Sequence, residues 1–137
     1  MLVKTIKYED YNGNEIEEKF YFNLSKAELI EMTNSVKGGL EAYLTRIIES
    51  NDNPEIMNYF KEIIMKSIGR KSDDGKRFIK NQEIRDEFEQ SEAYSELLWE
   101  LFSDPQKSGE FVNHLIPKNL EEEIRKLDVK TEANKTE

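Results

Sequence analysis

Apolar and polar residues alternate along the first part of the chain, from position 2 to position 22. A period of two is typical of a β-strand that buries one face. The alternation is interrupted at 11–14, where the sequence reads Tyr-Asn-Gly-Asn. An Asn-Gly pair between two alternating runs is a strong signal for a hairpin turn. We therefore predict a β-hairpin over residues 2–22.

The apolar pattern also selects the register of this hairpin. A three-residue loop with Gly13 in the left-handed conformation pairs Tyr8 with Ile16 and gathers the apolar side chains on one face. A two-residue loop would place the apolar residues of the two strands on opposite faces. In the favoured register Lys4 lies opposite Phe20 and is an imperfection of the apolar face.

From residue 25 the apolar spacing changes to three and four residues, which is the period of an amphipathic helix. Ser25 and Glu28 form a capping box, with apolar residues on either side for a hydrophobic staple. This helix should end at Gly38-Gly39, and a second should cover about 39–50. Further start signals predict helices opened by Asn53-Pro54 (with Asn53 as cap), Asn81, Ser91 and Asp104-Pro105.

Between the third and fourth helices, residues 70–80 read as a loop with a turn at Asp73-Asp74-Gly75. Phe78 and Ile79 are expected to add a short strand. Pro117 should end the last core helix, and residues 119–127 carry a second capping box followed by an amphipathic stripe. Residues 128–137 have almost nothing to bury and are expected to be disordered.

These elements predict a mainly α fold with an N-terminal β-hairpin, of the α+β class, with about five to six helices. We expect one globular domain over 1–127, composed of the hairpin 2–22, a helical core 25–116 and a terminal helix 119–127. The disordered tail 128–137 should follow it.

Composition narrows the function classes. The 137 residues carry a net charge of −9, from 20 basic and 29 acidic side chains. This balance disfavours binding to nucleic acid and to anionic membranes, because both need an excess of Lys and Arg. The chain has no cysteine, which excludes disulfides and thiolate metal sites. No apolar run approaches the ~18 residues of a membrane span, and the N-terminus has no signal-peptide pattern.

The sequence offers little for catalysis. His114 is the only histidine, so no histidine cluster or Ser-His-Asp arrangement can be assigned. Asp73-Asp74-Gly75 lacks the alternating acidic ligands of a calcium loop, and Gly75-Lys76 lacks the upstream glycine of a phosphate loop. We therefore expect no enzymatic activity, no cofactor and no metal.

Three surfaces are candidates for partner binding. Arg70, Lys71, Lys76 and Arg77 lie in a basic island that either contacts an acidic partner or a second copy, or is a solvated loop. Trp99 and Met65 lie off the centre of their apolar stripes, either as interface anchors or as margins of the core. The terminal helix either docks on a partner or folds back on its own domain. The residues of its apolar face are Leu120, Ile124 and Leu127.

Three stretches of the chain carry a resemblance to a known family: GNEIEEKFYFNLSKAELIEM (13–32), GRKSDDGKRFIKNQEIRDEFEQSEAYSELLWELF (69–102) and FVNHLIPKNL (111–120). They resemble tail assembly chaperones of long-tailed phages (siphoviruses) and prophages of Gram-positive bacteria. The resemblance implies a non-enzymatic protein that binds the tape measure protein, a long helical protein that sets tail length. It also implies that the chaperone keeps this partner soluble and helps to recruit tail tube subunits around it.

The same resemblance implies a place and a time of action. The protein would act in the host cytoplasm and be absent from the mature virion, and this chain looks like the short product of a family often made in two lengths. A homo-oligomer is compatible with it. Two other functions stay open: a morphogenesis protein retained in the particle, and a small acidic inhibitor of a host protein. The acidic face over 83–100 is short and interrupted by Arg85, which disfavours the inhibitor.

Overall fold

The computed structural model describes residues 1–116, 122–123 and 126, with Glu41 described by its backbone alone. This part of the chain contains four strands and six helices, which confirms the predicted fold class. The predicted tail 128–137 lies outside the described residues. So does the predicted helix 119–127, apart from three positions that are helical and exposed: Glu122, Glu123 and Lys126.

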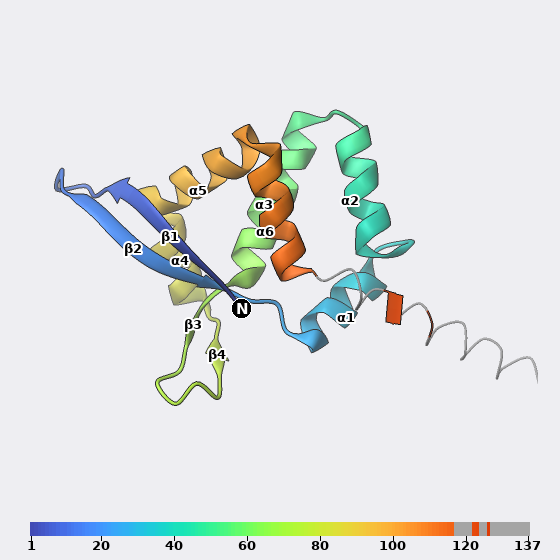
Figure 1. The fold of residues 1–137 in the computed structure, drawn as a ribbon, viewed down its shortest axis with the longest axis horizontal. Coiled ribbons are helices and arrows are strands. Elements are labelled where there is room, and N and C mark those ends of the chain that lie inside the picture. The colour runs from blue at the N-terminus through green and yellow to red at the C-terminus, as the bar shows by residue number, and fades with distance from the viewer. Residues whose placement is uncertain (117–121, 124–125, 127–137) are drawn as a thin grey trace, which may run out of the picture.

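The strands form one antiparallel sheet in the order β1-β2-β3-β4 (Figure 1). β1 covers Leu2–Glu9, β2 Glu15–Phe22, β3 Ile68–Lys71 and β4 Phe78–Ile79. Tyr8 pairs with Ile16, and Leu2 with Phe22, so the predicted hairpin register is confirmed. Gly13 has a φ of +84°, the left-handed conformation that the loop requires.

The prediction of a loop over 70–80 is wrong at its start, where Arg70 and Lys71 belong to β3. They pair with Ile79 and Phe78 of β4, which confirms the short strand predicted there. The physical reason lies at Gly69. A Cβ atom at this position would lie 2.4 Å from the Phe78 ring. Because glycine has no Cβ, the Phe78 side chain of β4 can pack directly against the backbone of β3.

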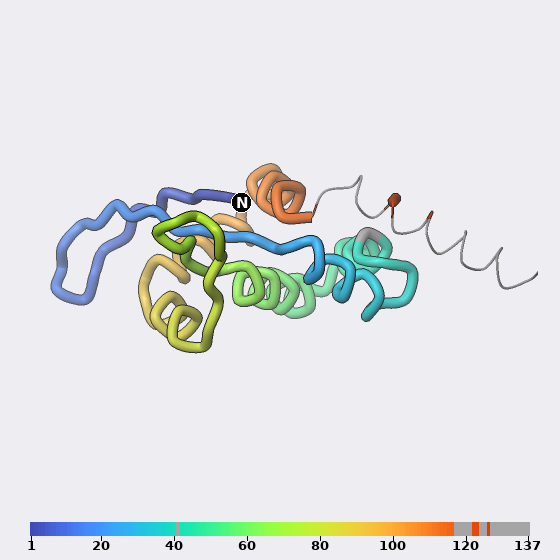
Figure 2. Tube along the Cα trace, turned by 90° about the horizontal axis from the view of Figure 1, so that it is seen from below, coloured from blue at the N-terminus to red at the C-terminus, as the bar shows by residue number. Residues whose placement is uncertain are grey.

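The six helices follow the predicted order, and Figure 2 shows α6 on one side of β2 with α3 and α4 on the other. In both views α2 lies at the end of the molecule opposite to the tip of the β1–β2 hairpin. The helices are α1 Lys26–Ser35, α2 Gly39–Glu49, α3 Asn53–Ser67, α4 Gln82–Glu89, α5 Glu92–Ser103 and α6 Pro105–Leu115.

The helix starts confirm most of the predicted caps. Ser25 and Glu28 form the capping box, and the side chains of Asn81 and Asp104 accept backbone hydrogen bonds at the starts of α4 and α6. The cap of α3 is Asp52 rather than the predicted Asn53: its carboxylate accepts from the Glu55 N–H at 3.2 Å. A carboxylate at this place also stabilises the positive end of the helix dipole.

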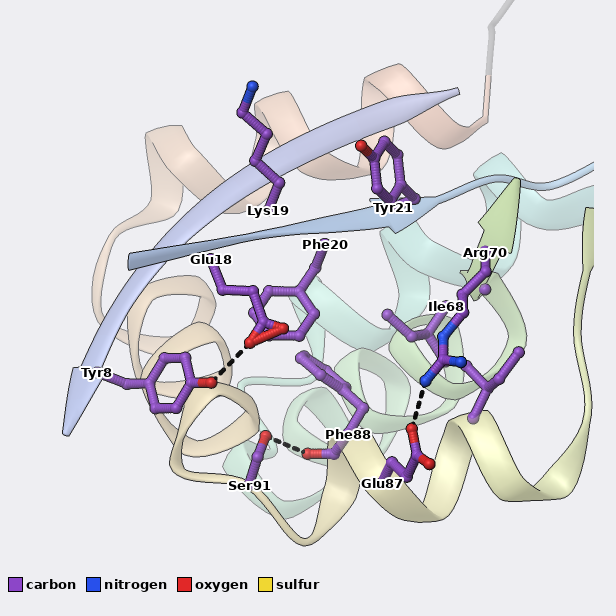
Figure 3. Close-up of a pocket in the computed structure, with 12 residues that line it drawn as sticks. Tyr8, Glu18, Lys19, Phe20, Tyr21, Ile68, Arg70, Glu87, Phe88 and Ser91 are labelled. Atoms are coloured by element: carbon purple, nitrogen blue, oxygen red, sulfur yellow. Dashed lines mark hydrogen bonds and ion pairs between the residues drawn. The ribbon is translucent and has the colours of Figure 1, made fainter. Parts of the chain in front are cut away.

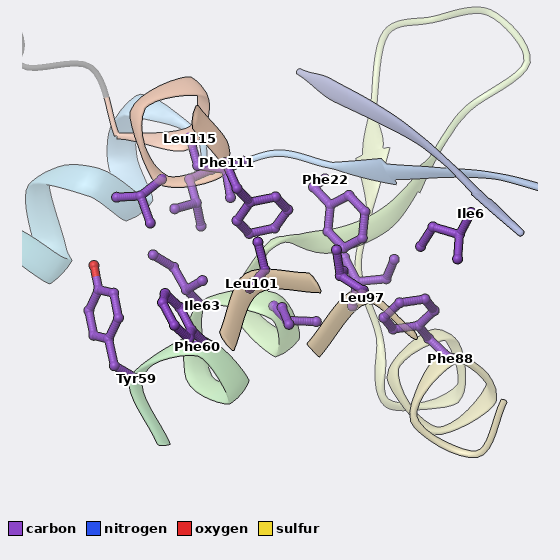
Figure 4. Packing of buried hydrophobic residues seen from close by; sticks show 14 of the residues in the cluster. Ile6, Phe22, Tyr59, Phe60, Ile63, Phe88, Leu97, Leu101, Phe111 and Leu115 are labelled. Atoms are coloured by element: carbon purple, nitrogen blue, oxygen red, sulfur yellow. The ribbon is translucent and has the colours of Figure 1, made fainter. Parts of the chain in front are cut away.

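The core lies between the hairpin and the helices (Figure 4). Phe22 at the end of β2 has no exposed surface, and its ring packs edge-on against Phe88 of α4 and Phe111 of α6. Below these rings, Ile63 of α3 and Leu101 of α5 are also almost fully buried. The sheet and all six helices of the described residues share this one hydrophobic cluster.

Lys4, a polar residue on the apolar face, is held by an ion pair. Its Nζ donates to Glu100 Oε2 of α5 at 2.7 Å, and Lys107 Nζ lies 3.2 Å from the other carboxylate oxygen. Burial raises the pKa of Glu100, but the hydrogen bonds from Lys4 and Lys107 outweigh this effect and leave the pKa below its ordinary value. The pair therefore fastens β1 to α5 while Glu100 is ionised.

The variant Lys4→Met should lower the free energy of unfolding at pH 7 by about 1 kcal/mol, since the pair is charge-assisted but keeps some contact with solvent. A carboxylate with a lowered pKa contributes stability above its unfolded-state pKa, near 4.5, and loses it as the pH falls through the folded-state value. The difference between the two proteins should therefore shrink from pH 5 to pH 3, measured by urea unfolding. Lys7→Met, on the opposite face of β1, is the control; a difference unchanged down to pH 3 would contradict this account.

Candidate protein-binding groove

An apolar groove lies between α2, α3 and α6, and the end of α5 closes one side of it. Its volume is about 350 Å³. The apolar side chains that line it are Leu44, Ile47, Ile48, Ile56, Tyr59, Phe60, Leu101, Phe102, Pro105 and Val112. Gly109 and three polar residues complete the lining: Asn53, Ser108 and Asn113.

The groove exists because two helices have apolar stripes wider than the core can cover. In α2, Ile47 is 2% exposed, whereas the next residue, Ile48, is 56% exposed. In α5, Leu101 is 1% exposed and Phe102 is 38% exposed. Each helix thus turns one edge of its stripe into the core and leaves the other edge at the groove. Exposed apolar surface of this kind is typical of an interaction site.

Trp99 extends this apolar surface. It is 67% exposed and lies one helical turn before Phe102 on α5, so the two side chains are neighbours on the helix surface. Trp99 also borders a shallower hollow against Thr5 and Lys7 of β1. An exposed tryptophan beside an apolar groove is a suitable anchor for a protein interface.

One end of the groove is acidic. Ile48 and Asn53, which line it there, flank the corner between α2 and α3. This corner carries exposed Glu49, Asp52 and Glu55. Asp104 stands at the neighbouring corner, where α5 passes into α6 beside Phe102 and Pro105. A ligand with basic groups at this end would be favoured.

A second hollow of about 390 Å³ lies between β2, β3 and α4 and is more polar (Figure 3). The Tyr8 hydroxyl donates to Glu18 at 2.7 Å, and this hydrogen bond, with burial, raises the pKa of Tyr8 to about 12. Arg70 pairs with Glu87. The Tyr8–Glu18 hydrogen bond thus joins β1 to β2, and the Arg70–Glu87 ion pair joins β3 to α4.

The predicted basic island lies on the β3–β4 hairpin. Lys71, Lys76 and Arg77 are exposed there, and Arg70 is exposed although it pairs with Glu87. Figure 1 shows this hairpin away from α2, and none of its residues lines the groove. The island is therefore a separate surface.

The other predicted residues lie apart from the groove or outside the described residues. Met65 of α3 is half-buried against the core, and its carbonyl accepts from Arg85 Nε at 3.1 Å. Leu120, Ile124 and Leu127 lie outside the described residues. Among the predicted residues that the structure describes, none lines the groove, and Trp99 lies beside it, one helical turn before the lining residue Phe102.

The residues that form the groove were not identified from the sequence. In the sequence, Ile48 and Phe102 continue the apolar stripes of their helices, and Gly109 gives no signal. The one usable sign was the excess of apolar residues in the stripes of α2 and α5, such as the adjacent pair Ile47-Ile48. Stripe width alone does not say which edge stays uncovered.

The described residues offer no second kind of site. Nowhere among them do three or more Asp, Glu or His side chains gather in a way that could hold a metal ion. No helix in the described part of the chain has the length and apolar character needed to cross a bilayer.

Comparison with known proteins gives one match. Searches of the curated proteins and of the solved structures found no similar protein. A family model described as phage tail assembly chaperone matches residues 1–137, the full length of the sequence. This match confirms the resemblance drawn from the three sequence stretches. The chain belongs to the phage tail assembly chaperone family.

Proposed function

We propose that this chain binds the tape measure protein, keeps it soluble before the tail is built, and promotes assembly of the tail tube around it. Membership of the tail assembly chaperone family, which is not a family of enzymes, supports an action on tail proteins. The observation that carries the proposal is the apolar groove with Trp99 at its margin. Apolar side chains of a partner can be buried from solvent in this groove.

The shape of the groove suits a helix. Four helices line it, and its apolar side chains form a trough in which a partner's residues at i, i+3, i+4 and i+7 can be buried. The tape measure protein, as a long helical protein, presents such stripes before it is packed into a tail. One groove of this size covers about two turns of helix, so each contact is weak enough to be displaced when tube subunits arrive.

Charge supports the same role. The net charge of −9 makes chaperone-coated complexes repel one another, which opposes aggregation of the client. The acidic end of the groove favours client helices whose apolar stripe is flanked by Lys or Arg. Selection then rests on a pattern that many segments of a long helical protein can share.

The remaining partners follow from this role. The basic island of Arg70, Lys71, Lys76 and Arg77 is suited to an acidic partner, and a second copy of this acidic chain is one. Met65 also stays a candidate for contact with the partner, although it is half-buried. We place the action in the host bacterial cytoplasm during growth of a siphovirus of Gram-positive bacteria, with the tail tube protein as a second partner and this chain as the short product.

The double variant Ile48→Glu/Phe102→Glu should abolish client solubilisation. Two carboxylates in an apolar interface cannot be paired there, and affinity should fall by about 100-fold or more. The fold should be kept, because both side chains already contact solvent. The test is co-expression with the tape measure protein, scored as the soluble fraction of that client.

The matched control is Val3→Glu, an exposed apolar position on the outer face of β1, which should solubilise the client like the natural chain. If the natural chain leaves the client insoluble, the proposed function is wrong. If the double variant solubilises it equally well, the function stands but the groove is not its surface.

Trp99→Ala should weaken client binding by about 30-fold, the effect of losing an aromatic anchor worth about 2 kcal/mol. The weaker binding should appear as a faster dissociation rate, measured with the client immobilised on a surface. Tyr11→Ala removes another exposed aromatic side chain, at the tip of the hairpin, and should leave the rate unchanged. Equal effects of the two substitutions would remove Trp99 from the interface.

Purified virions should contain no peptide of this chain by mass spectrometry, whereas infected-cell lysates should contain it. A chaperone that leaves during assembly is lost with the soluble fraction. Stoichiometric recovery from washed particles would instead favour a structural component retained in the tail.

A further inference from the structure

Gly109 marks a place on α6 where a second helix can approach closely. It lies in the middle of α6, where glycine destabilises a helix relative to alanine, and it lines the groove. A Cβ atom at this position would meet nothing within 4 Å, so packing within the described residues does not require glycine. Its neighbour Ser108, also in the lining, is small as well. This opening suits an occupant whose backbone passes close to α6.

The chain itself supplies a segment of matching length. The groove follows α6 from Pro105 to Asn113, which corresponds to about 12 Å of helix. The sequence 120–127 would also extend for about 12 Å as a helix. It starts four residues beyond Ile116, the cap of α6. A connection this short joins neighbouring antiparallel helices, so the segment needs only to turn back along α6 to reach the groove.

The segment has the chemistry of a groove ligand. Leu120, Ile124 and Leu127 recur at i, i+4 and i+7, the pattern by which a helix lays one face into an apolar trough. The positions between them that the structure describes carry the polar face: Glu122, Glu123 and Lys126 are helical and exposed.

The order of charges also fits an antiparallel arrangement. Three glutamates occupy 121–123, and Arg125 and Lys126 come last. Antiparallel to α6, the basic end would reach the start of that helix, where Asp104 and the acidic α2–α3 corner lie. The reversed orientation would place the glutamates at this acidic end, which like-charge repulsion disfavours.

We propose that residues 119–127 dock in the groove as a helix antiparallel to α6, and that a client helix must displace them. The first part concerns the free protein; the second rests on the proposed function. Self-occupation covers the apolar groove when no client is present. It also lowers the apparent affinity for clients, because a client can bind only during the fraction of time in which the groove is free.

The test is disulfide trapping in the full chain, which has no cysteine of its own. Ile48→Cys places a thiol at the acidic end of the groove, where the docked position 127 would lie. A disulfide needs Cα atoms about 4.4–6.8 Å apart, so Ile48→Cys/Leu127→Cys should cross-link within one molecule. The matched control is Ile48→Cys/Lys126→Cys, one residue earlier on the polar face. We expect the first pair to form its disulfide at least about tenfold faster, because docking raises the effective thiol concentration.

Products are separated on non-reducing gels at several protein concentrations, after circular dichroism has shown that both variants are folded. Equal rates for the two pairs would overturn the docking. Predominantly dimeric products would overturn it too, since they would assign the groove to the segment of a second copy. Neither result involves the client, so both leave the proposed function untouched.

The displacement is tested by adding the tape measure protein to the Ile48→Cys/Leu127→Cys variant under the same oxidation. The intramolecular disulfide should form several-fold more slowly when client occupies the groove. A cross-linking rate unchanged by saturating client would overturn the competition. In the converse experiment, Leu120→Glu/Ile124→Glu should free the groove and tighten client binding several-fold; unchanged or weaker binding would contradict it.

Discussion

The whole structure depends on the burial of Phe22 between two helices that come much later in the chain. Its ring centroid lies 5.9 Å from that of Phe88 and 5.4 Å from that of Phe111, with the rings near perpendicular in both pairs. Edge-to-face contacts of this kind stabilise beyond the area they bury. Because Phe88 belongs to α4 and Phe111 to α6, the last residue of β2 holds both helices against the sheet. One of them, α6, is a wall of the groove.

The groove is therefore formed by the sides of the helices that face away from the core. Once Phe111 and Leu115 of α6 face the hairpin, helix geometry turns Pro105 and Gly109 toward α2. The same reasoning applies to α2, where the burial of Ile47 leaves Ile48 at the surface. A substitution that rotated either helix would reshape the groove without touching a residue that lines it.

Local signals made the fold largely predictable, but they did not make the groove predictable. The hairpin register followed from a period of two and one left-handed glycine, and the caps at Ser25, Asn81 and Asp104 followed from side chains that can reach a free N–H. The predictions were wrong where two adjacent residues can both cap a helix, and where pairing with a strand distant in the sequence determines the local structure. Asp52 and Asn53 can both cap α3, and Arg70 joins a strand because β4 and the buried start of β3 are there to pair with it. The groove depends on how α2, α5 and α6 sit together, which no local pattern encodes.

Strand edges are a further place where copies of a chain can associate, and one edge of this sheet carries charges that oppose such pairing. β3 pairs with β2 at Tyr21 and Phe22, so the described edge over 15–20 is open to another strand. This edge carries Glu15, Glu17, Glu18 and Lys19, and charges on an open edge oppose edge-to-edge pairing. With a net charge of −9 on the whole chain, copies repel one another at long range, and attraction between them rests on local surfaces such as the groove, Trp99 and the basic island. A groove that its own chain can cover would then bind clients without also binding other copies.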